Sequence, residues 1–493
     1  MPFNTLGIWL GFDYPLSLKR EGIGRVFLYL IKHLLRNYPV NVEIWCYECN
    51  YAEVTDMLSE LMSESGYNDR IKILTEKRLL KPATSRSEAF KNALNLIAGM
   101  IKHTDITNWK EPYRKYKAYQ NRSSGNKEKR RYWPVDITLT FILIFFSFIA
   151  GIVRRLISKT PFIRKVPNND SMDCLVSLAN RFSKADCFLI YIVTLNNAVY
   201  LKVPKLVFLP DLVTLEFPDY FIANDSNAKI WIEHGKTSVR KYGDHGAYFC
   251  AISEYVIKNQ LLKYFVTIKK EKTTHIYLAS MLPDDILSRI PAEKEIRDKY
   301  KINRQYIFYP TQIRPYKNII VLLKALKLLK DKNILLQLVL TGLIKDDPKT
   351  YDYAKDNELI HDIILCGSLS ETELFGLYRY AEMVISPSLF EGGFPLQALE
   401  ALSMDTPIIL ANIPVTVERL KNEGFISENC GLKMFESENE YDLAHNIMKV
   451  LDNRQKTVLE QQNVKHKLLS YTWDDVSKHY YELFTKIIKE GRK

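Results

Sequence analysis

The chain has 493 residues, of which 47% are hydrophobic and 26% are charged. This length is too great for one ordinary domain, so the sequence predicts two or three folded domains with a sizeable core, and the composition excludes global disorder. Seven cysteines, an odd number, argue against a disulfide framework and favour a reducing compartment, and the first residues, MPFNTLGIWLGFD, lack the pattern of a secretory signal.

The net charge of +12 is concentrated in one segment. Residues 102–165 contain 15 Lys and Arg against 4 Asp and Glu, which leaves 54 basic and 53 acidic residues in the rest of the chain. A local basic segment predicts an anionic partner, either lipid or nucleic acid. The basic residues flank an apolar run and do not interleave with a recognition fold, which favours anionic lipid and disfavours nucleic acid.

The N-terminal part alternates between strand-like and helical patterns. Leu6–Leu10 is expected to form a strand, and a glycine-containing loop and a helix over Val26–Leu35 follow it. A second strand is expected at Val42–Tyr47. Because strands and helices alternate, residues 1–300 are predicted to form a mostly parallel sheet covered by helices. Further strands of this sheet are expected at the runs that begin at Cys187, Leu206, Tyr248 and Thr274.

Residues from about 50 to 185 are predicted to be an insert in this first domain. Within it, residues 137–153 form an uncharged, mostly apolar run with basic clusters on both sides and Trp and Tyr upstream, the composition of a membrane interface. A helix of this length spans about 25 Å, less than a hydrocarbon core of about 30 Å. A single span would also separate strands of one sheet across the membrane. The run is therefore expected to be an interfacial or re-entrant membrane element, with a buried helix of the soluble domain and a true span as alternatives.

The alternating pattern restarts near residue 300. A strand is expected at Tyr306 and a helix over Ile319–Leu329, so residues 301–470 are predicted to form a second doubly wound domain. Residues 471–493 contain an amphipathic helix that suits either domain. Such folds bind ligands at the carboxyl ends of their strands, so the site is expected in a cleft between the two domains. Later strands are expected at the runs that begin at Leu336, Asp362, Met383 and Pro407.

The most specific motif is SPSLFEGGFPLQALEAL, which begins at Ser386. A strand is expected to end there, and Gly392 and Gly393 let the backbone approach a ligand closely. A helix expected to start near Pro395 offers free N–H groups to a phosphate. Of the two carboxylates that follow, one in the turn and one in the helix, one can face a sugar and the other ribose hydroxyls. A capped surface helix with incidental glutamates is the alternative interpretation.

This segment resembles the retaining enzymes of glycosyltransferase family 4, also called glycosyl transferases group 1, whose signature is PSxxEGFGLPxxEAMACGTPVV. The resemblance implies the GT-B architecture, an α/β fold of two Rossmann-like doubly wound domains that face each other across a cleft. It implies that Glu391 contacts the transferred sugar and that Glu400 contacts the nucleotide ribose. Eight residues separate these glutamates, where the family has seven. The EGGFP variant is similar to surface-polysaccharide mannosyltransferases. The expected donor-binding turn comprises Gly392, Gly393, Phe394 and Pro395.

A second motif, YPTQIRPYKNI from Tyr309, resembles the first strand and loop of the family's C-terminal domain. Lys317 matches the lysine that binds the donor pyrophosphate, and Arg314 is a plausible partner. Cations suit this position because the departing nucleoside diphosphate gains negative charge. The chain contains no Asp-x-Asp triplet, so the expected chemistry uses no metal and no cofactor besides the nucleotide sugar donor. Solvated loop charges are the alternative.

Three weaker motifs match the family's order. In REGIGRVFLYL, Gly22 and Gly24 are expected to line the cleft, with a plain helix cap as the alternative. In FLPDLVTLEFPDYF, Asp211 is a candidate acceptor-side residue, although Pro210 replaces the family's histidine. Thr341 and Gly342 match a further donor-side position.

The resemblance implies transfer of a sugar from a nucleotide diphosphate sugar, with GDP-mannose favoured, to a hydroxyl of a glycan or lipid-linked acceptor. The anomeric configuration is expected to be retained. The enzyme is expected to act in surface-polysaccharide synthesis at the cytoplasmic face of a membrane, as a peripheral or re-entrant protein. The alternatives are a phosphorylase of the same architecture, an inactive scaffold that binds sugar nucleotides, and a nucleic-acid-binding protein.

Overall fold

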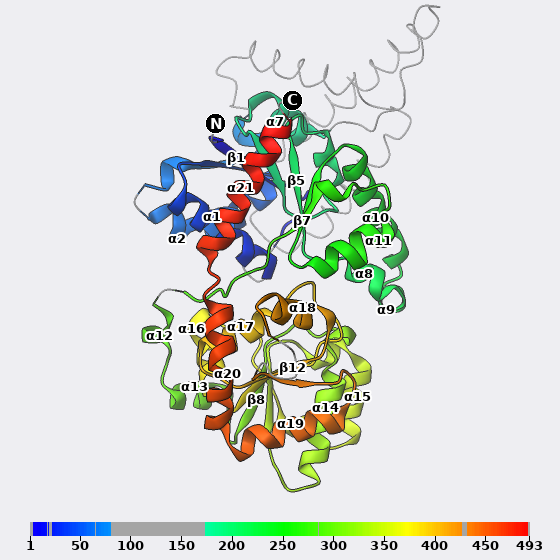
Figure 1. Ribbon diagram of the computed structural model, residues 1–493, viewed down its shortest axis with the longest axis vertical. Coiled ribbons are helices and arrows are strands. Elements are labelled where there is room, and N and C mark those ends of the chain that lie inside the picture. The colour runs from blue at the N-terminus through cyan, green and yellow to red at the C-terminus, as the bar shows by residue number, and fades with distance from the viewer. Residues whose placement is uncertain are drawn as a thin grey trace, which may run out of the picture. The chain divides into compact units, whose positions relative to one another are not determined.

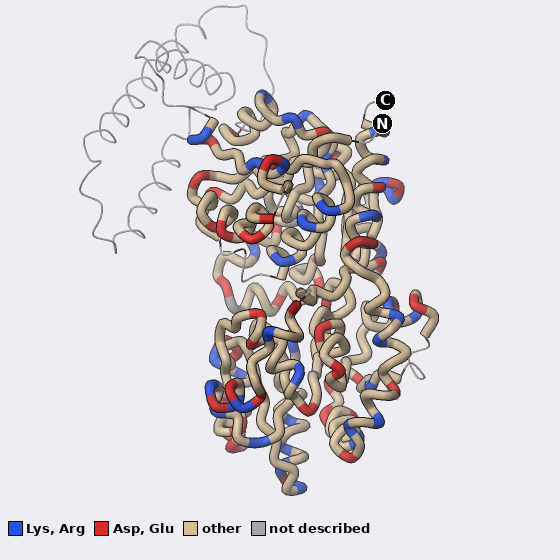
Figure 2. Tube along the Cα trace, turned by 90° about the vertical axis from the view of Figure 1, so that its left-hand side faces the viewer, with Lys and Arg blue, Asp and Glu red and all other residues tan. Residues whose placement is uncertain are grey.

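The computed structural model describes residues 3–16, 18, 22–64, 66–79, 173–283, 285–425 and 431–491. The apolar run 137–153 and most of the expected insert lie outside these ranges. No helix within them is both long and apolar enough to cross a membrane. Basic and acidic residues are interspersed along the described chain (Figure 2), in agreement with its nearly balanced charge.

The chain divides into two compact units, residues 1–75 with 182–493 and residues 76–181. In the second unit the described elements are α3 (Glu76–Leu79) and α7 (Cys174–Phe182). The first unit contains both predicted sheets, and the description below concerns this unit alone.

The N-terminal domain is built on a seven-stranded parallel sheet in the order β3-β2-β1-β4-β5-β6-β7 (Figure 1). The four central strands β1, β4, β5 and β6 contain no exposed residue, as expected for parallel strands that are covered on both faces. The order 3-2-1-4-5-6 is that of a doubly wound nucleotide-binding sheet. The strands are β1 (Thr5–Leu10), β2 (Asn41–Cys46), β3 (Ile71–Leu74), β4 (Cys187–Ile190), β5 (Lys205–Leu209), β6 (Tyr248–Ala251) and β7 (Thr273–His275).

The helices of this domain lie between the strands in sequence, as the alternating pattern predicts. The first follows β1 directly and buries seven residues of one face. The helices are α1 (Gly22–Asn37), α2 (Tyr51–Ser63), α8 (Val213–Glu216), α9 (Pro218–Asn224), α10 (Ala228–Asp244), the π-helix η7 (Val256–Leu261) and α11 (Leu262–Tyr264).

The strand β3 lies inside the segment that the sequence assigned to the insert. Ile71–Leu74 pairs in parallel with β2, from Val42↔Ile71 to Trp45↔Leu74. It is an edge strand of four residues with only Ile71 buried, so it has no continuous apolar run that sequence periodicity could detect. The sheet therefore continues to residue 74, and the chain leaves it between β3 and β4.

The C-terminal domain is a six-stranded parallel sheet in the order β10-β9-β8-β11-β12-β13. Alternate residues of β8 enter different cores: Ile307 and Tyr309 pack in one cluster, and Tyr306 and Phe308 in the other. The sheet is therefore covered on both faces, as predicted. The strands are β8 (Tyr306–Tyr309), β9 (Gln337–Leu340), β10 (Ile363–Leu365), β11 (Met383–Ser386), β12 (Ile408–Ala411) and β13 (Lys433–Phe435); the last was not predicted.

Two sets of helices supply these cores. The first cluster contains residues of α14 (Ile319–Lys330), α15 (Pro348–Asp356) and α19 (Glu440–Asp452). The second contains residues of α12 (Ile286–Arg289), α13 (Glu293–Tyr300), α16 (Glu371–Tyr380), α17 (Leu396–Ser403), α18 (Pro414–Asn422) and α20 (Arg454–Leu469).

The last helix, α21 (Trp473–Gly491), packs on the N-terminal domain against α1 and β4. The rings of Tyr38 and Tyr481 stack with centroids 3.9 Å apart. Asp474 Oδ1 lies 2.7 Å from His33 Nδ1 and accepts a hydrogen bond of 2.6 Å from Asn37 Nδ2. The preceding α20 packs on α17 of the C-terminal domain. The chain end thus returns to the first domain, a choice that the sequence left open.

We expect Phe484→Ala to detach or loosen α21. Phe484 is fully buried and lies 5.8 Å from the ring of Phe3, and truncation of a buried phenylalanine costs about 3–5 kcal/mol. The midpoint of thermal unfolding of the N-terminal domain should fall by several degrees, as measured by circular dichroism. Leu459→Ala in α20, at a residue that is 67% exposed, should leave the midpoint almost unchanged; equal effects of the two changes would contradict this packing.

Candidate active site

An ion pair joins the loops that follow β8 and β11. Lys317 Nζ lies 2.6 Å from Glu391 Oε1, and the two side chains are only 15% and 16% exposed. Burial by itself lowers the pKa of Lys317, but the Glu391 carboxylate, together with Tyr309 and Tyr316, outweighs this effect and holds that pKa above its usual range. Lys317 therefore stays charged at any physiological pH. The two sequence motifs that contain these residues therefore meet in space.

Neighbouring polar groups lock the two loops in place. Ser388 Oγ donates to Glu391 Oε1 over 2.7 Å and lies 2.8 Å from the hydroxyl of Tyr309. Asn318 Nδ2 donates to the carbonyl of Pro387 over 3.2 Å. Asn318 has a φ of +53°, a left-handed conformation that asparagine adopts more readily than most residues. Sequence reasoning missed these three supporting residues, although all lie within or beside the two quoted motifs.

The glycine turn after Glu391 contacts loops of the N-terminal domain. An ideal Cβ on Gly392 would lie 2.2 Å from the carbonyl oxygen of Pro210, and one on Gly393 would lie 3.0 Å from that of Ile252. Ser253 Oγ donates to the Gly392 carbonyl over 2.6 Å. The glycines are therefore needed for a close approach of protein backbone, whereas the sequence assigned them to a ligand.

Asp211 joins the charged cluster from the end of β5. Its Oδ1 accepts a hydrogen bond of 2.9 Å from the Val213 amide. Desolvation raises the pKa of the Asp211 carboxyl and Glu391 raises it further, while the amide and Lys317 lower it, with a net increase. Asp211 thus belongs to the same electrostatic site as Lys317 and Glu391, as its position in the sequence suggested.

The second glutamate of the motif, Glu400, lies on α17 and is 4% exposed. The hydroxyl of Tyr378 donates to its Oε2 over 2.6 Å, and Arg25 Nη1 lies 3.2 Å from its Oε1. Tyr378 and Arg25 were not predicted. Arg25 directly follows the glycines of the REGIGR motif, and this position was the one available signal.

The remaining predicted residues have different surroundings. Gly24 packs against Leu18, whereas Gly22 is exposed. Thr341 Oγ1 accepts from the Thr311 amide over 2.9 Å, in the loop after β8. Arg314 is exposed on that loop, and its Nη2 donates a hydrogen bond to Gln312 Oε1 over 3.3 Å. The structure therefore does not bring Arg314 into contact with Glu391.

The other predicted donor-side residues pack within the C-terminal domain. Gly342 packs on Thr311 and Ile313, Phe394 packs on the second core cluster, and Pro395 is the N-cap of α17.

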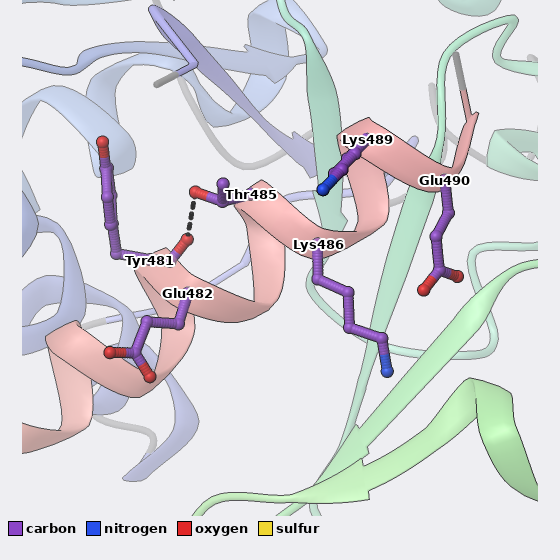
Figure 3. Close-up of a pocket in the computed structure, with 6 residues that line it drawn as sticks. All are labelled: Tyr481, Glu482, Thr485, Lys486, Lys489 and Glu490. Carbon is purple, nitrogen blue, oxygen red and sulfur yellow. Dashed lines mark hydrogen bonds between the residues drawn. The ribbon is translucent and has the colours of Figure 1, made fainter. Parts of the chain in front are cut away.

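A separate hollow of about 530 Å³ lies on the surface of α21 (Figure 3) and contains none of the predicted residues. One face of a single helix lines it, and Glu490 at its edge is already bonded to the hydroxyl of Tyr248. This hollow offers no convergent set of catalytic groups. Within the described ranges, no group of three or more His, Cys, Asp or Glu residues has a metal-binding arrangement.

Comparison with known proteins shows which proteins this chain resembles. Residues 292–466 match the family model for Glycosyl transferases group 1. This match falls on the C-terminal domain. A solved structure, Anabaena Alr3699/HepE in complex with UDP and glucose, matches with a TM-score of 0.56 and 12% identity over 98% of this chain and 100% of its own. At this identity the match shows the fold alone, and it confirms the predicted GT-B architecture.

Two curated relatives match shorter segments. The lipopolysaccharide 1,2-N-acetylglucosaminetransferase of Salmonella typhimurium is 24% identical over 189 residues, 36% of this chain and 47% of its own length. The O-antigen chain mannosyltransferase B of Escherichia coli is 29% identical over 148 residues, 29% of this chain and 39% of its own. The chain thus aligns with less than half the length of each relative.

We expect Gly24→Ala to destabilise the protein and Gly22→Ala to be neutral or slightly stabilising. A Cβ on Gly24 would lie 2.0 Å from the carbonyl oxygen of Leu18, whereas one on Gly22 meets no described atom within 4 Å. Alanine is otherwise favoured over glycine in a helix by about 1 kcal/mol. Thermal unfolding followed by circular dichroism measures both variants; equal midpoints would refute the close contact at Gly24.

We expect Asp211→Asn to gain stability relative to the wild type as the pH rises. The raised pKa of Asp211 means that the folded state binds this proton more tightly than the unfolded state. The resulting stabilisation is complete below the unfolded pKa of about 3.9 and is lost as the pH rises through the folded pKa. The difference in melting temperature, variant minus wild type, should therefore increase between pH 4 and pH 8. A flat profile for Asp211→Asn would disprove the expectation.

Proposed function

We propose that this protein is a glycosyltransferase that moves a sugar from a nucleotide diphosphate sugar to a hydroxyl of a glycan or lipid-linked acceptor. The observation that carries this proposal is the Lys317–Glu391 pair, 2.6 Å apart, within a domain that matches Glycosyl transferases group 1. The names of the curated relatives, both transferases of lipopolysaccharide or O-antigen sugars, support a role in surface-polysaccharide synthesis.

In this proposal Lys317 stabilises the leaving nucleoside diphosphate. Cleavage of the glycosidic bond leaves an additional negative charge on the diphosphate, and a fixed cation in a water-poor site lowers the energy of that charge. An ammonium group has three donors, so Lys317 can keep its bond to Glu391 and still donate to a phosphate oxygen. Arg314, exposed on the same loop, is the proposed second cation. No metal ion is required for this step.

Glu391 is proposed to orient the transferred sugar. Its Oε1 is held by Lys317 and Ser388, so the carboxylate has a fixed direction and can stabilise positive charge that develops at the anomeric carbon. Departure and attack on the same face of the sugar would then retain the configuration. Asp211, from the opposite domain, is proposed to lie on the acceptor side.

The donor is proposed to place its ribose at Glu400. A buried carboxylate that accepts ribose hydroxyls is the role that the family resemblance implies. GDP-mannose remains the favoured donor because of the EGGFP variant, and the mannosyltransferase relative supports this choice. The N-acetylglucosaminetransferase relative makes UDP-sugars the main alternative.

The acceptor is proposed to be reached at the cytoplasmic face of a membrane. The support is the sequence alone: the apolar run 137–153 and the 15 basic residues of 102–165 combine apolar and electrostatic attraction to anionic lipid. In this arrangement the catalytic domains stay on one side of the membrane.

A panel of nucleotide sugars tests the proposal. The full chain in detergent is incubated with each donor, with and without lipid extract as acceptor, and released nucleotides are separated by chromatography. We expect one donor to be consumed, and we expect Lys317→Ala to reduce the rate by about 10²–10³-fold, the usual effect of removing a stabilising group from a developing anion. Lys324→Ala, on α14 with a side chain that is 41% exposed, is the matched control and should retain full activity.

Glu391→Gln provides a second variant in case Lys317→Ala fails to fold. Glutamine keeps an oxygen for Ser388 and Lys317 but removes the charge, so the fold should survive while transfer is lost. Calorimetric binding of a donor without turnover under all conditions would favour an inactive scaffold. Full activity of both variants would disprove the proposed chemistry.

A further inference from the structure

The side chain of Arg25, in the N-terminal domain, reaches the predicted ribose site in the C-terminal domain. It lies on α1, and its Nη1 is 3.2 Å from Glu400 Oε1 on α17. Its Nη2 donates to the carbonyl oxygen of Met281 over 3.3 Å. Nothing in the sequence motifs assigned a role to this arginine, yet it is the described cation nearest to the carboxylate that the family resemblance places at the ribose.

The guanidinium of Arg25 has a donor that the protein does not use. Its Nε is buried and has no hydrogen-bond partner among the described residues, although the side chain as a whole is 25% exposed. A buried donor without a partner is costly, so native proteins rarely leave one unexplained. A ligand oxygen that enters beside Glu400 would satisfy this N–H.

The charge of Arg25 is secure. Burial by itself lowers the pKa of Arg25, but Glu400, together with smaller contributions from Tyr29, Glu371 and Tyr378, outweighs this effect and the pKa is raised. Glu400 in turn has its other oxygen, Oε2, occupied by the hydroxyl of Tyr378. The carboxylate is thus fixed from both domains, with Arg25 on one side and Tyr378 on the other.

The neighbouring glycine explains how Arg25 reaches this position. Gly24 lets α1 approach the backbone of Leu18 so closely that a Cβ would lie 2.0 Å from its carbonyl oxygen. The start of α1 is therefore held at a fixed place, and Arg25, which directly follows Gly24, faces α17. Gly24 thus allows the close approach of α1 to Leu18, and Arg25 supplies the positive charge beside Glu400.

We propose that Arg25 and Glu400 bind the nucleotide ribose together. A ribose hydroxyl donates a hydrogen bond to the Glu400 carboxylate, and the same hydroxyl accepts a hydrogen bond from Arg25 Nε. A hydroxyl is both donor and acceptor, and a carboxylate beside a guanidinium presents the complementary pair. This inference rests on the proposed function, because it needs a nucleotide at Glu400. It adds that the nucleotide is held by both domains, so that its binding favours the arrangement in which α1 and α17 meet.

Calorimetry with two ligands and two variants tests this assignment. The full chain is titrated with UDP and GDP and, for whichever binds, with its 2′,3′-dideoxy counterpart. Arg25→Lys keeps the charge and a donor for Glu400 but removes Nε. We expect it to weaken binding of the ribonucleotide about tenfold, the effect of losing one hydrogen bond to a charged group, and to change binding of the dideoxynucleotide by less than twofold.

Arg36→Lys is the matched control, because Arg36 is exposed in the last turn of the same helix; both ligands should bind it as they bind the wild type. If Arg25→Lys binds the ribonucleotide as tightly as the wild type, the inference is overturned. Equal weakening for both ligands also overturns it, since Arg25 would then act on the phosphates or on the fold. If the wild type binds neither nucleotide, the proposed function fails first, and this outcome is distinct from the other two.

Discussion

The site depends on the absence of a side chain at Gly392. The carbonyl oxygen of Pro210 occupies the place that a Cβ would take, at 2.2 Å, so the turn that carries Glu391 can lie directly on the loop that carries Asp211. Any other residue would force the two loops apart. The hydrogen bond from Ser253 to the Gly392 carbonyl holds the same turn from a second strand end. Because β5, β6, β8 and β11 all end at these loops, one glycine allows four strand ends to meet, as the rule for ligand sites in doubly wound sheets requires.

Charge balance explains why this meeting of loops is stable. Lys317 neutralises Glu391 and Arg25 neutralises Glu400, at 2.6 and 3.2 Å, so each motif glutamate has one cation. Unpaired, either carboxylate would be costly to bury, whereas a partly buried pair with further hydrogen bonds is tolerated. Burial raises the pKa of Asp211 and Glu391 adds to this increase, which the Val213 amide and Lys317 only partly offset.

The sequence predicted most of the fold because buried parallel strands are continuous apolar runs. Eleven strands were expected where they occur, from Leu6–Leu10 to the run at Pro407. The two missed strands, β3 and β13, are edge strands with mostly partly exposed residues, whose patterns are too weak to detect. At the site, the resemblance to the family's motifs predicted Lys317, Glu391 and Glu400. It could not identify Arg25 or Tyr378, because their proximity to Glu400 arises from tertiary packing over 375 and 22 positions of sequence separation.

The same charge balance limits how a diphosphate can be bound. With both motif glutamates paired, and Asp211 adding a negative group, Arg314 is the cation among the described side chains of this site that is left to attract an anion. We therefore expect main-chain N–H groups to supply further hydrogen bonds to a diphosphate. α17 begins after Pro395 without a side-chain cap, and a helix N-terminus attracts negative charge. A nucleotide held in this way would depend on fixed backbone geometry for affinity and on Lys317 for charge stabilisation in the transition state. This division of roles matches the differential binding that catalysis requires.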